Sequence, residues 1–90
     1  MATDVHRREH DYEITVDGRH AGLAAFLERP GVVVFTHTEI DDAFEGQGIG
    51  SALARAALDD VRARGLKVDP RCPFIKAWIE RHPDYEELVA

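Results

Sequence analysis

Cysteine is almost absent from this sequence, since Cys72 is the one cysteine among 90 residues. A single cysteine excludes an intramolecular disulfide framework. The sequence also lacks an apolar run near the length of about 18 residues that a membrane-spanning helix needs, and its N-terminus lacks a signal-peptide pattern. Internal repeats and low-complexity segments are absent as well. These absences lead us to expect a cytoplasmic protein with no membrane partner.

Basic residues are scarce relative to acidic ones, with 11 Lys and Arg against 17 Asp and Glu and a formal net charge of −6 at pH 7. Nucleic-acid binding is therefore not expected, because it depends on a basic face that neutralises phosphates. A single anionic ligand held by backbone amides is compatible with this charge. The length predicts one domain. Residues 1–10 are polar and predict a flexible N-terminal segment, so the domain is expected over residues 11–90.

Three successive strands are predicted in the first half of the chain. Residues 11–16 alternate between apolar and polar side chains, as a half-buried strand does. Asp17-Gly18 is a strong two-residue hairpin signal and leads to a second strand over residues 19–28. A turn at Arg29-Pro30-Gly31 precedes the β-branched run of residues 32–40, which favours a central strand. The three strands are expected to form an antiparallel meander.

Two helices and one further strand are predicted after the meander. Apolar residues at helical spacing predict a helix over residues 48–64, with Gly65 as its C-terminal cap. Residues 66–69 predict a short strand, and a right-handed crossover makes its pairing parallel. Pro73 suits the first position of a second helix, whose N-cap is then Cys72. The predicted fold is an α/β domain in the order β-β-β-α-β-α with a mostly antiparallel mixed sheet.

A glycine-rich stretch, Glu45-Gly46-Gln47-Gly48-Ile49-Gly50-Ser51, separates the last meander strand from the long helix. Glycines at this junction allow backbone N–H groups to approach an anion, and the first helical turn adds unpaired N–H donors and a partial positive charge. The stretch therefore predicts a phosphate-binding turn. It does not fit the dinucleotide-binding fingerprint, which needs Gly or Ala where Ser51 or Leu53 stands, and it lacks the Gly-Lys-Ser/Thr of the Walker pattern.

The glycine stretch instead resembles the pyrophosphate turn R/Q-x-x-G-x-G/A of the GCN5-related N-acetyltransferases, with Glu45 in place of the Arg or Gln. The element order over residues 11–90 resembles the central part of the same fold. The similarity is closer to a branch of short YjdJ-like proteins that bind acetyl-CoA. The segments that carry it are Phe35-Thr36-His37-Thr38-Glu39-Ile40, the glycine turn, Cys72-Pro73-Phe74-Ile75, Trp78-Ile79 and His82-Pro83-Asp84-Tyr85.

The resemblance implies a binding site for a coenzyme A thioester. The amides of the glycine turn would hold the pyrophosphate, the backbone around Ile40 to Asp42 would pair with the pantetheine arm, and the thioester would lie near Cys72. The implied ligand-binding residues are Ile40, Asp42, Gly46, Gln47, Gly48, Ile49, Gly50, Ser51 and Phe74. No metal site is expected.

The chain departs from the usual pattern of this family in three places. Residues 1–10 are all that precedes the predicted meander, where the family has a further strand and helices that shape the acceptor site. We expect no counterpart of the family's C-terminal strand pair. The position of the family's general-acid Tyr, counted from Cys72, holds Ile79.

Three side chains are candidates for chemistry. The helix dipole at an N-cap favours the thiolate of Cys72, which makes it a candidate nucleophile that takes the acetyl group and passes it on. A small, buried, inert thiol is the alternative. Glu39 and His37 lie two apart on one strand and share a face, so Glu39 is a candidate general base and His37 a candidate proton relay to Cys72. An exposed polar pair at a strand end is the alternative for these two residues.

The function expected from the sequence is acetyl transfer from acetyl-CoA to an unknown amine or thiol acceptor. The second hypothesis is a non-catalytic module that binds acetyl-CoA or CoA, as a sensor or as a partner subunit. The third is a nucleotide-phosphate binder that uses the same glycine turn.

Overall fold

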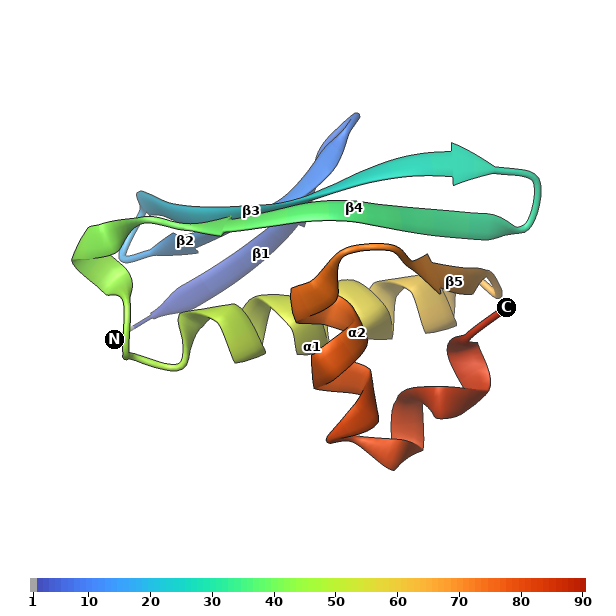
Figure 1. Cartoon of the computed structure of the whole chain (residues 1–90). Helices are drawn as coiled ribbons and strands as arrows, with labels where there is room; N and C mark the ends of the chain where they lie inside the picture. Colours follow the sequence, from blue (N-terminus) through green and yellow to red (C-terminus); the bar gives the residue numbers. More distant parts are fainter. Residues whose placement is uncertain (1) are drawn as a thin grey trace.

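The computed structural model describes residues 2–90 and shows a five-stranded sheet in the order β1-β2-β3-β4-β5, with two helices packed against one face (Figure 1). Neighbouring strands are antiparallel except β4 and β5, which are parallel. The predicted α/β class with a mostly antiparallel mixed sheet is confirmed. The elements are β1 (Thr3–Arg7), β2 (Asp11–Val16), β3 (Arg19–Arg29), β4 (Val32–Ile40), the 3₁₀ turn η1 (Asp42–Phe44), α1 (Ile49–Ala63), β5 (Lys67–Pro70), α2 (Pro73–Glu80) and the 3₁₀ turn η2 (Pro83–Leu88).

The N-terminal segment differs from the prediction. Residues 3–7 form β1, an edge strand paired with β2, so the order is β-β-β-β-α-β-α rather than β-β-β-α-β-α. Val5 is partly buried against the core and its neighbours in the strand are exposed. An edge strand that buries one side chain has no clear apolar pattern, which is why its polar composition predicted a flexible segment. The flexible segment expected over residues 1–10 is therefore corrected to a strand over its central part.

The local turn and cap signals are confirmed. Asp17 and Gly18 both have positive φ angles, of 49° and 82°, as the two-residue turn between twisted strands requires. Gly65 follows α1 with a φ of 71°, which is the left-handed conformation that ends many helices. Cys72 is the N-cap of α2 and Pro73 is its first residue.

The core lies between the sheet and the two helices. Tyr12, Phe26 and Phe35 project from neighbouring strands, with ring centroids 5.2 to 6.3 Å apart. One face of α1 covers them, and Trp78 of α2 belongs to the same buried cluster. The buried residues of α1 are Ile49, Leu53, Ala54, Ala57, Leu58 and Val61. Within residues 2–90, no helix combines the length and apolar character needed to cross a membrane.

An irregularity in β4 decides which side chains face the helices. The register with β3 shifts between Phe35 and His37, which leaves Thr36 without a partner as the extra residue of a bulge. Phe35 is buried in the core before the bulge, and Thr38 faces the same side after it, where its hydroxyl contacts Cys72. Because side chains alternate along a strand, His37 and Glu39 point to the outer face, away from the helices.

The sheet opens between β4 and β5. The two strands pair at Val32–Phe35 with Lys67–Pro70, and the N–H of Cys72 then donates to the carbonyl of Phe35 at 2.9 Å. The last five residues of β4 therefore have no strand beside them on that side within the described chain. The α2 helix begins at this opening, so its N-terminal turn faces the end of β4 (Figure 1).

Candidate functional site

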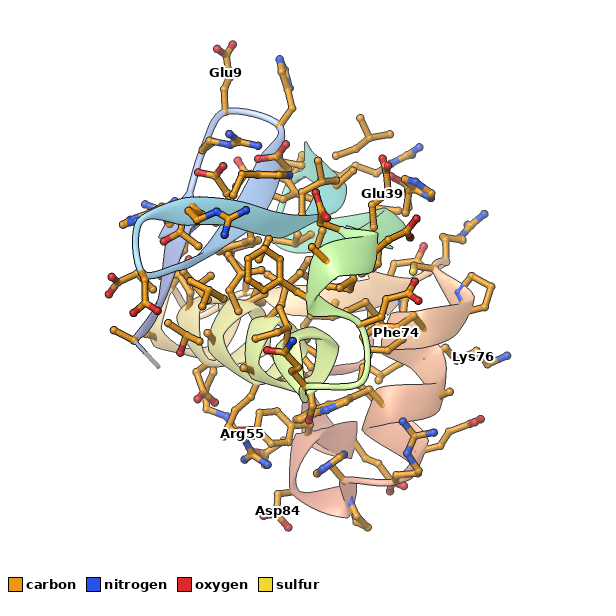
Figure 2. The ribbon with its side chains drawn as sticks, turned by 90° about the vertical axis from the view of Figure 1, so that its left-hand side faces the viewer. Glu9, Glu39, Arg55, Phe74, Lys76 and Asp84 are labelled. Carbon is orange, nitrogen blue, oxygen red and sulfur yellow. The ribbon has the colours of Figure 1, made fainter. Side chains whose placement is uncertain are left out.

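A cleft of about 330 Å³ lies between the end of β4, the glycine turn and one side of α2. β4 contributes Ile40 and the first turn of α1 contributes its N-terminal residues. α2 contributes side chains at helical spacing on one of its faces. The full lining is Ile40, Phe44, Glu45, Gly46, Gly48, Ile49, Gly50, Ser51, Phe74, Trp78 and Arg81. Figure 2 looks toward this end of the molecule and shows Phe74 between the glycine turn and α2.

The backbone of the glycine turn presents a row of unused donors. Gly46 and Gly48 have φ angles of 78° and 74°, in the left-handed region that favours glycine. The intrahelical bonds of α1 start with the N–H of Ala52, which donates to Gly48. Within residues 2–90, none of the backbone N–H groups from residue 46 to residue 51 makes a short, well-aligned hydrogen bond to a protein acceptor. Six consecutive free donors at a helix N-terminus are suited to an anion with several oxygens.

Gly50 has a different role from the two other glycines. Its φ angle is not positive, but a Cβ at this position would lie 2.8 Å from Cζ of Phe74. The absence of a side chain therefore lets α2 approach the first turn of α1. Gly46 and Gly48 have open space where a Cβ would be, so their requirement is one of backbone conformation.

Trp78 forms the wall of the cleft on α2 and is held from several directions. Its indole Nε1 donates to Oγ of Ser51 at 2.9 Å, which links the two helices. Its ring stacks on His82, with centroids 3.8 Å apart, and the guanidinium of Arg55 lies 5.3 Å from the ring centroid. Tyr85 packs edge-on against it at 4.9 Å. Burial, followed by a hydrogen bond to Asp59, raises the pKa of the Tyr85 hydroxyl.

Cys72 lies beside the cleft rather than on its surface. Its side chain is 3% exposed, and it belongs to the buried core cluster. Its Sγ is 3.2 Å from Oγ1 of Thr38, and either atom can donate in that contact. Phe74, two residues further along the chain, does line the cleft, whereas Cys72 is not among the lining residues. Thr38 was not predicted as a site residue, because the bulge that turns it toward Cys72 leaves no local pattern.

Glu39 and His37 share a face, as their spacing predicts, but it is the outer face of the sheet. Nε2 of His37 is 3.1 Å from a carboxylate oxygen of Glu39, and both side chains are about three-fifths exposed. Figure 2 shows Glu39 on the side of the sheet away from the helices. Because of the bulge, these two residues lie on the other face of the sheet from Thr38, so His37 does not contact Cys72. The geometry assigns Thr38, rather than His37, as the polar partner of the thiol.

The other predicted ligand-binding residues divide into two groups. Ile40, Gly46, Gly48, Ile49, Gly50, Ser51 and Phe74 line the cleft together. Asp42 lies in η1 and Gln47 on the exposed surface of the turn, and neither side chain lines the cleft. Trp78 and Arg81 line it but were not predicted as binding residues, although their spacing from Phe74 on one helix face was available in the sequence. Residues 2–90 contain no group of His, Cys, Asp and Glu that could hold a metal ion.

A family model described as GCN5-related N-acetyl-transferase matches residues 11–88 of this chain. The chain belongs to the GCN5-related N-acetyltransferase family. Members of this family typically bind acetyl-CoA. The family match spans the four strands β2 to β5, the glycine turn and both helices, which are the parts that build the cleft.

Curated relatives agree with this assignment, and solved structures share the fold. The human protein NATD1 is 34% identical over 79 residues, which cover 86% of this chain and 70% of that protein. NATD1 of Danio rerio is 33% identical over 92 residues, which cover 92% of this chain and 84% of that protein. A GCN5-like protein from Staphylococcus aureus, solved by NMR, superposes with a TM-score of 0.74 at 21% identity, covering 97% of this chain and 87% of that one. The ribosomal-protein-S18-alanine N-acetyltransferase of Escherichia coli superposes with a TM-score of 0.61 at 22% identity, covering 69% of this chain and 42% of that one. At these identities the two structures show the fold alone.

Proposed function

We propose that this protein binds acetyl-CoA in the cleft and transfers the acetyl group to an amine or thiol acceptor. The observation that carries the proposal is the row of six N–H groups at residues 46–51 that have no well-aligned protein acceptor. These donors and the partial positive charge of the helix N-terminus suit the anionic acceptor oxygens of the pyrophosphate of coenzyme A. Family membership supports the same ligand.

The opening between β4 and β5 provides the path for the pantetheine arm. Ile40 lines the cleft, and the strand beside it has no neighbour at its last five residues. An extended amide-containing arm pairs with such an edge as an added strand would. An arm that runs from the glycine turn along this edge brings the thioester to the N-terminal turn of α2, beside Phe74, Thr38 and Cys72.

Two routes for the acetyl group follow from this placement. In direct transfer, the acceptor amine enters from the outer face, loses its proton to Glu39 of the exposed Glu39–His37 pair, and attacks the thioester carbonyl, and CoA leaves as the thiolate. In the covalent route, the Cys72 thiolate attacks first, the acetyl–CoA bond breaks, and the acceptor then takes the acetyl group from Cys72. The burial of Cys72 favours direct transfer, because an acceptor reaches the outer face without crossing the core.

A non-catalytic acetyl-CoA or CoA module is the second candidate. Ile79 is buried at 4% exposure and cannot protonate a leaving thiolate, although it occupies the position that holds the family's general-acid Tyr by sequence count. The hydroxyl of Tyr85 donates to Asp59, and Arg55 donates to Tyr85, so this tyrosine is engaged in the α1–η2 contact. A module that binds without turnover needs no such acid.

The binding step is tested by calorimetric titration with acetyl-CoA, with NAD and ATP as control ligands. Gly48→Val should abolish saturable binding, because a β-branched residue is strained at a φ of 74° and displaces the adjacent N–H groups. Gly48→Asn is the matched control, since Asn tolerates the left-handed conformation and should keep most of the affinity. Equal affinity of Gly48→Val and the wild-type protein would refute the phosphate assignment.

The transfer step is tested by release of free CoA thiol from acetyl-CoA with and without a panel of amines. Acceleration by an amine would establish transfer. Glu39→Gln should then lower the rate by about 10²-fold, as loss of a general base does. Cys72→Ser should leave the rate within a few-fold if transfer is direct. Saturable binding without any release would favour the non-catalytic module.

A further inference from the structure

Most arginines of this acidic protein are paired with carboxylates. The paired residues are Arg7 with Asp60, Arg8 with Asp11, Arg62 with Glu87, Arg64 with Glu28 and Arg71 with Asp69, at distances of 2.6 to 3.2 Å. Pairing of this kind is expected where carboxylates outnumber cations. An arginine without a carboxylate partner in such a protein therefore marks a place where positive charge is left available.

The arginines without a carboxylate partner within residues 2–90 are Arg19, Arg29, Arg55 and Arg81. Arg81 lines the cleft itself. Arg19 lies 5.6 Å from the ring centroid of Phe44, and Arg55 lies 5.3 Å from that of Trp78; both rings line the cleft. Arg29 lies at the β3–β4 turn instead. Three of these four arginines therefore lie in the cleft or against a ring that lines it.

The cleft has two chemically different ends along α2. Phe74 marks the end next to Cys72 and Thr38, and Arg81 marks the other end. The two residues are seven positions apart, which is about 10 Å along a helix. The glycine turn lines the same cleft as these two residues, and its N–H groups have no well-aligned protein acceptor. A ligand whose thioester lies at the Phe74 end and whose pyrophosphate lies on the turn therefore carries its nucleotide toward Arg81.

We propose that Arg81 binds a third phosphate of the ligand, the monoester on the ribose of coenzyme A, and so makes the cleft selective for CoA over its 3′-dephospho form. This inference rests on the proposed function. A phosphate monoester carries up to two negative charges and offers oxygens in the geometry that a guanidinium matches with two N–H groups. Arg55 is held against Trp78 and Tyr85, so its charge lies next to a ring that lines the same cleft as Arg81. Glu45 in the glycine turn also lines the cleft, and its negative charge reduces the positive potential there.

The test is a thermodynamic cycle in which the Arg81 charge is removed from the protein and the 3′-phosphate is removed from the ligand, each separately and both together. Calorimetric dissociation constants are measured for CoA and for 3′-dephospho-CoA, with the wild-type protein and with Arg81→Gln. The wild-type protein should prefer CoA by about tenfold, which is the worth of one charge-assisted contact. Arg81→Gln should weaken CoA binding by about tenfold, change dephospho-CoA binding by less than twofold, and so abolish the preference.

Arg29→Gln is the matched control, because it removes the same charge from an arginine without a carboxylate partner at the far hairpin. It should keep the preference for CoA, and thermal unfolding should show that both variants are folded. Equal wild-type affinity for the two ligands, an intact preference in Arg81→Gln, or a preference lost in Arg29→Gln as well would each overturn the role of Arg81 while leaving the pyrophosphate site standing. Failure of the wild-type protein to bind either ligand would overturn the proposed function and this inference together.

Discussion

At the scale of single residues, the glycine turn contains two different uses of glycine. Gly46 and Gly48 adopt a left-handed backbone in open space, whereas Gly50 has ordinary helical geometry and leaves room for Phe74. The sequence predicts that the glycines are needed but not which constraint each satisfies. The spacing of Gly50 and Phe74 along the chain carries no sign of their contact, since it depends on how α2 packs on α1.

Gly50→Ala tests the close approach of Gly50 and Phe74, two residues that line the cleft. The new Cβ would lie 2.8 Å from Cζ of Phe74, so the ring has to rotate away. The unfolding free energy should change by less than about 1 kcal/mol, because the gain in helix propensity offsets the cost of moving one ring. Affinity for acetyl-CoA should fall about tenfold, because the displaced ring moves into the cleft.

The double variant Gly50→Ala/Phe74→Leu is the control for that experiment. A smaller side chain at position 74 should make room for the added methyl group and restore most of the affinity. Denaturant unfolding and calorimetry on both variants supply the two measurements. If the double variant binds as weakly as Gly50→Ala alone, the contact with Phe74 is not the cause of the loss.

Glu45→Gln tests the one departure of the glycine turn from the family pattern. Glu45 lines the cleft whose glycine turn offers N–H donors to an anion, so its negative charge is expected to repel the ligand that the turn attracts. Removing the charge should strengthen acetyl-CoA binding about threefold, as expected for one screened charge near the surface. Glu9→Gln at the β1–β2 turn makes the same charge change far from the cleft (Figure 2) and should have no effect on affinity. Unchanged affinity in Glu45→Gln would mean that its carboxylate points into solvent.

At the scale of elements, signals that lie within a few residues predicted the structure well. The Asp17-Gly18 turn, the cap at Gly65 and the start of α2 at Cys72-Pro73 each depend on the backbone preferences of the residues themselves. The bulge at Thr36 and the edge strand β1 depend on pairing with distant strands, so they left no comparable signal. For the same reason the sequence placed Glu39 and His37 together but left open which side of the sheet they occupy, and the structure shows the exposed pair that was the alternative.

The hydroxyl of Tyr12 in β2 donates a hydrogen bond to Asp60 in α1, and this contact should make the stability of the fold depend on pH. Burial, followed by the 2.6 Å hydrogen bond from its hydroxyl to Asp60, raises its pKa to about 12. The folded state therefore holds this proton more tightly than the unfolded state, whose tyrosine pKa is about 10. The resulting stabilisation is complete below pH 10 and is lost as the pH rises from 10 to 12, by roughly 1–2 kcal/mol.

The measurement is denaturant unfolding at a series of pH values from 8 to about 11.5, on the wild-type protein and on Tyr12→Phe. The variant should be less stable at pH 8 by about 1 kcal/mol, because Asp60 loses a hydrogen-bond donor. The difference between the two proteins should shrink as the pH approaches 12. A difference that stays constant across this range would contradict the raised pKa of Tyr12.

At the scale of the whole molecule, the helices cover one face of the sheet, and β1 extends that sheet at its far edge (Figure 1). The α/β class, the strand order from β2 to β5 and the position of the cleft followed from the sequence because apolar periodicity and the glycine turn report them directly. The site residues contributed by α2 followed only in part, since their meeting with the glycine turn is a result of tertiary packing.

Deletion of residues 1–9 tests whether β1 is part of the domain. Loss of the partly buried Val5, of the Arg7–Asp60 ion pair and of one strand pairing should lower the unfolding free energy by about 2 kcal/mol. β2 then becomes an exposed edge, so the shortened protein should self-associate at high concentration, as size-exclusion chromatography would detect. Undiminished stability together with a monomeric profile would show that residues 1–9 are not needed for the fold.

The single cysteine of the chain is buried at the N-terminus of α2, and this placement makes it a natural reporter of opening. A thiol that is 3% exposed reacts with an alkylating reagent when the wall between β4 and α2 separates, not while it is closed. The alkylation rate of the unmodified protein therefore measures how often this wall opens. A ligand that fills the neighbouring cleft would slow that rate in proportion to its occupancy, so one mass measurement of adduct formation reports both the motion and its arrest without any introduced label.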